Sequence, residues 1–112
     1  MKHVTYGEKS LLMGDAAADT LLEYARLVAD NQKADTVTLQ SVSPDGNIVE
    51  ASFLLSASTV LIVESTNSEM EPPDNADAVA EMQDRIDAVT RPMAAPAEGP
   101  WPEEDYDAPI PR

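Results

Sequence analysis

Apolar residues recur every three or four positions in two stretches of the chain, which predicts two amphipathic helices. The first helix follows Gly14, with Asp15 expected as its N-cap, and ends near residue 31. Its apolar face consists of Ala18, Leu21, Leu22, Ala25, Val28 and Ala29. The second helix is expected to be capped by Asp74, and its buried stripe consists of Val79, Met82, Ile86 and Val89. Each helix therefore has one face to bury against another layer.

Alternating apolar and polar residues predict five strands, at 3–6, 10–13, 36–42, 48–55 and 59–64. The turn after the third strand contains Pro44 and Gly46, of which the first presets φ and the second accepts a positive φ. The last strand is apolar on both faces, which is typical of a central or covered strand. The short connections between the last three strands predict an antiparallel meander.

The predicted order ββαβββα indicates an α+β fold of two layers, with both helices on one face of the sheet. We expect one compact domain over residues 1–91. The other face of the sheet is expected to carry Ile48, Leu54, Leu61 and Val63 beside hydroxyl side chains. Such a face favours a homodimer formed through the sheet, although the tail or the 65–73 loop is an alternative cover.

The composition changes at Pro92, because six of the nine prolines and five acidic residues lie in 92–112. Burial in this segment cannot offset the entropy of ordering it, so we expect a disordered, acidic, proline-rich tail. Trp101, Tyr106 and Ile110 are candidates for anchoring the tail in a groove of a protein partner, while its carboxylates are attracted to a basic rim. The alternatives are a solubilising tail or one that folds back over its own domain.

The chain of 112 residues has 7 basic and 21 acidic side chains, a net charge of −14. This charge opposes direct binding to nucleic acid, whose affinity comes mainly from Lys and Arg. Acidic residues are also spaced 3, 4 and 3 positions apart on the second helix, which places them on one face: Asp74, Asp77, Glu81 and Asp84. This acidic strip is either a surface for a basic partner, an imitation of nucleic-acid phosphates, or a solvated helix face.

The residue inventory favours no catalytic or metal chemistry. The absence of cysteine and the single histidine exclude disulfides, thiol catalysis and zinc sites of Cys/His type. No nucleophile elbow or glycine-rich phosphate loop is present. We therefore expect a protein that is not an enzyme and has no cofactor. The N-terminus does not resemble a signal peptide and the longest apolar run, 60–63, is too short to span a membrane, so we expect a cytoplasmic protein.

Four segments together resemble a small uncharacterised protein family from high-GC Gram-positive bacteria. They are His3-Val4-Thr5-Tyr6-Gly7, 12–19, 34–39 and Pro73-Asp74-Asn75-Ala76. The resemblance covers residues 1–91 and implies a cytosolic bacterial protein, but no activity and no functional residues. The order of elements is also similar to that of secretion-chaperone-like dimers, at the level of fold alone.

These observations favour a non-enzymatic protein-interaction module that uses its acidic domain and tail to bind a protein partner with a basic surface. One alternative is a charge-mimicking inhibitor or antitoxin-like regulator of a basic or nucleic-acid-binding protein. Another is a secretion-chaperone-like dimer. The sequence identifies neither the partner nor the pathway.

Overall fold

The computed structural model describes residues 1–90 and confirms the predicted order of elements. The elements are β1 (Lys2–Tyr6), β2 (Lys9–Met13), α1 (Asp15–Asp30), β3 (Asp35–Val42), β4 (Ile48–Leu55), β5 (Leu61–Ser65) and α2 (Ala76–Thr90). The predicted tail over 92–112, with Trp101, Tyr106 and Ile110, lies outside the described residues.

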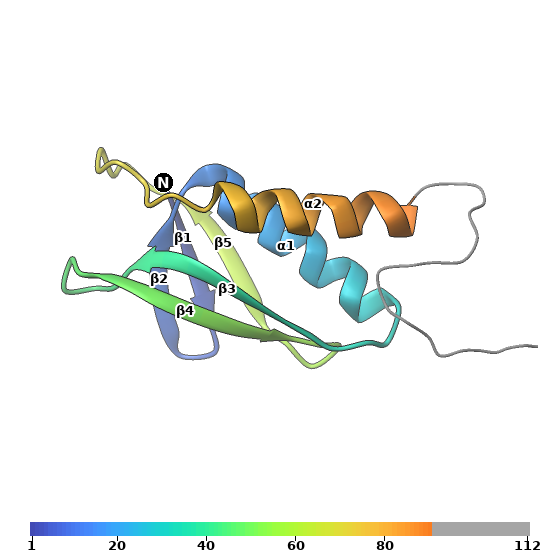
Figure 1. Ribbon diagram of the computed structural model, residues 1–112. Helices are drawn as coiled ribbons and strands as arrows, with labels where there is room; N and C mark the ends of the chain where they lie inside the picture. The colour runs from blue at the N-terminus through green and yellow to red at the C-terminus, as the bar shows by residue number, and fades with distance from the viewer. Residues whose placement is uncertain (91–112) are drawn as a thin grey trace, which may run out of the picture.

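The five strands form one antiparallel sheet, and both helices pack on the same face of it (Figure 1). This confirms the two-layer α+β fold. The second helix buries Met82 and Ile86, as its pattern predicts. The first helix buries Leu21 and Val28 but leaves Leu22 42% exposed, and Tyr24 is fully buried in the core. The N-cap of α1 is Gly14, whereas we predicted Asp15.

The strand order is β4-β3-β2-β1-β5, so the last three strands do not form the predicted meander. β3 and β4 form the expected hairpin, whose turn has Gly46 at a φ of +88°. β5 instead pairs with β1 at the opposite edge of the sheet, so the prediction of a central or covered strand was wrong.

The register of β5 explains why both of its faces are apolar. Val63 lies beside Val4 of β1, which is fully buried, and Leu61 also packs on the core. Ile62 points to the other face of the sheet, where it is 50% exposed. The prediction that Leu61 and Val63 share a face with Ile48 and Leu54 was therefore wrong.

β2 and β3 meet at one residue pair only, Leu12 with Val42. The rest of β3 extends beyond β2, so no described strand lies beside its edge from 36 to 40. The sheet also bends strongly, which brings Tyr6 of β1 into edge-to-face contact with Phe53 of β4, with ring centroids 5.7 Å apart. The Tyr6 hydroxyl donates a hydrogen bond of 2.5 Å to the carbonyl of Leu54.

Candidate functional site

Asn75 joins the beginning of α2 to the uncovered edge of β3. Its Oδ1 accepts a hydrogen bond of 2.7 Å from the backbone amide of Gln40, and its Nδ2 donates one of 2.9 Å to the Gln40 carbonyl. These are the two bonds that a residue of a neighbouring strand would exchange with Gln40. Asp74, the predicted cap of α2, lies one residue before the cap position, because the carbonyl of Asn75 accepts the first helical hydrogen bond, from Val79. The Asp74 carboxylate still accepts a hydrogen bond from the amide of Ala76 at 2.9 Å.

A second junction, at Arg85, holds α2 about three turns after Asn75. Arg85 Nη1 donates to Oδ2 of Asp35, the first residue of β3, at 2.5 Å. The buried Tyr24 hydroxyl of α1 donates to the same carboxylate oxygen. Burial, followed by this hydrogen bond, raises the pKa of Tyr24 above its ordinary value. The hydrogen bond with Tyr24 is the largest contribution that raises the pKa of Arg85.

The distance between the two junctions is the same along the helix and along the strand, so α2 lies alongside β3 and runs antiparallel to it. The helix between 75 and 85 spans about 15 Å, at 1.5 Å per residue. The strand between 35 and 40 spans about 16 Å, at roughly 3.3 Å per residue. The segment of α2 is thus held at both ends alongside the uncovered edge of β3.

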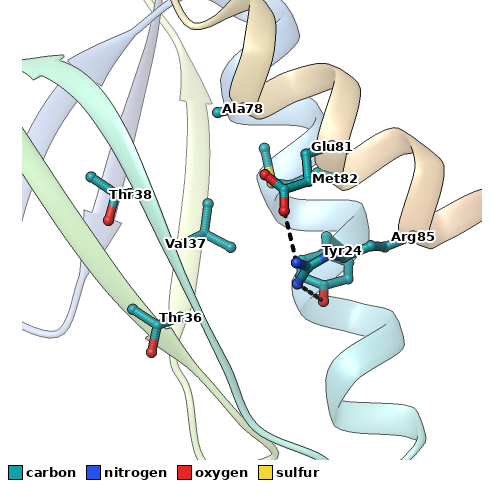
Figure 2. A pocket seen from close by; sticks show the side chains of 8 residues that line it. All are labelled: Tyr24, Thr36, Val37, Thr38, Ala78, Glu81, Met82 and Arg85. Atoms are coloured by element: carbon teal, nitrogen blue, oxygen red, sulfur yellow. Dashed lines mark hydrogen bonds and ion pairs between the residues drawn. The ribbon is translucent and has the colours of Figure 1, made fainter. Parts of the chain in front are cut away.

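Between these junctions lie two adjoining hollows, which we call the β3–α2 crevice. The first has a volume of about 270 Å³ and is lined by Tyr24, Thr36, Val37, Thr38, Ala78, Glu81, Met82 and Arg85 (Figure 2). The second, of about 210 Å³, is lined by Thr38, Gln40, Glu50, Asp74, Asn75, Ala76, Asp77 and Ala78. Thr38 and Ala78 belong to both hollows, so the crevice is continuous along β3.

The backbone of β3 offers hydrogen-bonding groups to this crevice. Successive residues of a strand direct their amide and carbonyl groups to opposite edges, so Thr36 and Thr38 direct theirs to the same edge as Gln40. The Thr36 amide is satisfied by the carboxylate of Asp35 at 2.8 Å. The Thr36 carbonyl and both backbone groups of Thr38 face the crevice, and no strand among the described residues pairs with them.

The two ends of the crevice differ in charge. Around Arg85 one positive charge partly offsets two negative charges, because the guanidinium pairs with Asp35 and, at 2.8 Å, with Glu81. Figure 2 shows Glu81 and Arg85 turned toward each other on the helix side of the hollow, across from Val37. At the other end Asp74, Asp77 and Glu50 line the hollow without a basic residue among its lining residues. The negative charge is therefore concentrated beside Asn75.

The structure divides the predicted acidic strip. All four residues are exposed, but only Asp74, Asp77 and Glu81 line the crevice, while Asp84 lines neither hollow. Sequence reasoning missed Asn75 and Asp35, because both act through contacts with residues distant in the chain. Tyr24 carried a usable signal, since it follows Leu21 by three residues on the buried face of α1.

The crevice is suited to hydrogen bonding and to attracting positive charge. Within residues 1–90, no group of three or more histidine, aspartate and glutamate side chains is placed to hold a metal ion. No helix in that part of the chain is long and apolar enough to cross a membrane.

Comparisons with models of known protein families, with curated proteins and with solved structures find no match to this chain. The resemblance to a bacterial family stays a prediction.

Proposed function

We propose that the protein is a non-enzymatic interaction module whose β3–α2 crevice binds an extended, basic segment of a partner protein. The observation that carries this proposal is the uncovered backbone edge of β3 at Thr36 and Thr38 inside a crevice rimmed by carboxylates. An extended peptide recognises such an edge through its own backbone, as in β-strand addition.

The fit is limited to a short segment. The two hollows together provide about 480 Å³ (270 and 210 Å³), which is space for a few residues and not for a domain. Asn75 already occupies the edge at Gln40, so the segment would pair with Thr38 and the carbonyl of Thr36. The fixed position of α2 limits the entropy lost on binding, since this wall is already held at both ends.

The charge of the rim sets the preference for a basic partner. Asp74, Asp77 and Glu50 lie at one end of the crevice, and the whole chain has a net charge of −14. A lysine or arginine of the segment would lie beside these carboxylates. Because such exposed charges are screened by salt, binding is expected to weaken as ionic strength rises.

A peptide titration followed by NMR tests the proposal. The probe is a hexapeptide of alternating lysine and valine, and we expect its addition to shift the amide signal of Thr38. The same peptide with N-methyl groups on the amides that face β3 should bind at least about tenfold more weakly, because it lacks backbone donors. Equal binding by the methylated peptide, or shifts confined to other strands, would contradict backbone pairing at this edge.

Paired charge variants distinguish binding at the crevice from binding along the whole acidic strip. Asp77→Asn with Glu81→Gln removes two charges from the crevice, whereas Asp84→Asn with Asp87→Asn removes two exposed charges of the same helix outside it. We expect the first pair to weaken peptide binding by about tenfold and the second by less than about threefold. Equal weakening would instead favour charge mimicry by the entire helix face.

A further inference from the structure

The outer edge of β4 is another backbone edge that no described strand pairs with, and it lies on the opposite side of the β3–β4 hairpin from the crevice. Gln40 pairs with Glu50 in register, but its backbone groups are bonded to Asn75 and not to β4. The backbone groups of Glu50 therefore point away from β3. By strand alternation, those of Ile48, Ser52 and Leu54 do the same.

The contacts of Leu54 independently confirm this direction. Its carbonyl accepts hydrogen bonds from the Tyr6 hydroxyl at 2.5 Å and from the Thr59 hydroxyl at 3.1 Å, and neither residue belongs to β3. On the face of β4 away from the helices, Ile48 is 64% exposed and Leu54 is 57% exposed. An uncovered strand with large exposed apolar side chains is a surface that favours strand pairing.

We infer that this edge binds a second copy of the chain, with β4 pairing antiparallel to β4 about a two-fold axis at Ala51. A dimer with this symmetry uses the same surface twice, so each residue must suit its counterpart. In this register Ile48 lies opposite Leu54 of the second copy, and Glu50 lies opposite Ser52. Each exposed apolar side chain thus covers another one, and no carboxylate directly opposes a carboxylate.

The neighbouring registers are less favourable. Centring the axis on Glu50 would place the two Glu50 carboxylates directly opposite each other, which destabilises a strand pair. Centring it on Ser52 would place Leu54 opposite Glu50, so the apolar side chain of Leu54 would face a carboxylate instead of Ile48. With the axis at Ala51, the two Glu50–Ser52 pairs exchange both of their backbone bonds.

The dimer is expected to be weak and to respond to salt in the opposite way to peptide binding. An interface of one strand from each copy lies below about 1,200 Å², which is typical of transient complexes, so we expect a Kd of roughly 10–100 µM. Two copies that each have a net charge of −14 repel each other. Salt screens this repulsion and should therefore tighten the dimer.

Disulfide cross-linking of the full chain tests the register directly. At the two-fold axis the two Ala51 residues form a non-hydrogen-bonded pair with Cα atoms about 4.5 Å apart, within the range that a disulfide bridges. The chain has no cysteine, so Ala51→Cys introduces the only thiol. We expect mild oxidation to convert it to a covalent dimer, while the matched variant Thr38→Cys on β3 stays mostly monomeric. Equal cross-linking of both variants would overturn the inference.

Sedimentation of the cysteine-free chain provides the second measurement. Leu54→Ser should weaken dimerisation at least about tenfold, because it removes both Ile48–Leu54 contacts at once. Ile62→Ser changes a similarly exposed residue on β5, at the other edge of the sheet, and should leave the dimer unchanged. A chain that stays monomeric throughout the expected range at high salt, or a dimer lost in Ile62→Ser, would exclude the β4 interface. Neither result would affect peptide binding at β3.

Discussion

Replacing Asn75 with alanine tests whether this side chain fastens α2 to the sheet. The change removes both hydrogen bonds to the backbone of Gln40, at 2.7 and 2.9 Å, and leaves that amide and carbonyl without their protein partner. Each neutral hydrogen bond contributes about 0.5–1.5 kcal/mol to stability. Gln40 is only partly buried, so water can replace part of the loss. We expect a decrease of about 1–2 kcal/mol in the free energy of unfolding, or roughly 5–15 °C in Tm.

Urea unfolding followed by circular dichroism measures the loss, and hydrogen exchange at Gln40 locates it. The matched control is Asn67→Ala, an identical change at an exposed position whose side chain makes no hydrogen bond within the described part of the chain. That variant should unfold like the wild type. A loss below about 0.5 kcal/mol in Asn75→Ala, together with unchanged protection of the Gln40 amide, would refute the role of Asn75 as a substitute for a strand residue.

Two further substitutions test the junction of Tyr24 with Arg85 and the buried lining of the crevice at Met82. The folded state raises the pKa of Tyr24, so the stability that its neutral form contributes is present below about pH 10 and is lost as pH rises further. Tyr24→Phe should therefore lose less stability than the wild type between neutral and alkaline pH, and parallel urea-unfolding curves would contradict this. Met82, which is 2% exposed, lines the crevice. Met82→Ala should cost about 2–5 kcal/mol in thermal melts, and a loss below about 1 kcal/mol would show that the site is not packed.

The sequence could predict what depends on local periodicity. Residues that face the core recur with the period of their own helix or strand, so Met82 and Ile86 were identified without knowledge of their neighbours. The same reasoning placed Ile48 and Leu54 on the face of the sheet away from the helices, where both are exposed. The acidic residues of α2 were predicted on an exposed face for the same reason.

Strand partners could not be predicted in this way, because pairing is a property of distant segments. The short connection after β4 suggested that β5 would lie beside it, but five residues, 56–60, suffice to reach β1. They suffice because the sheet bends until Tyr6 contacts Phe53. The apolar pattern of β5 is equally compatible with a central strand and with an edge strand. The site residues Asn75 and Asp35 were missed for the same reason.

The crevice arises from the mismatch between β2 and β3, whereas the edge of β4 is free because β4 is the outermost strand of the sheet. β2 has five residues, β3 has eight, and they share one pair at Leu12 and Val42. Most of β3 therefore extends past the end of β2, the strand that pairs with it on this side. β4 extends with β3 and is the outermost strand of the sheet. Asn75 and the Arg85 junction attach α2 beside the unpaired edge of β3 and narrow the space there to a crevice, whereas no described strand pairs with the outer edge of β4. A lengthened β2 that paired with Thr38 and Gln40 would close the crevice but leave β4 free. Such a variant should thus abolish peptide binding while preserving the dimer.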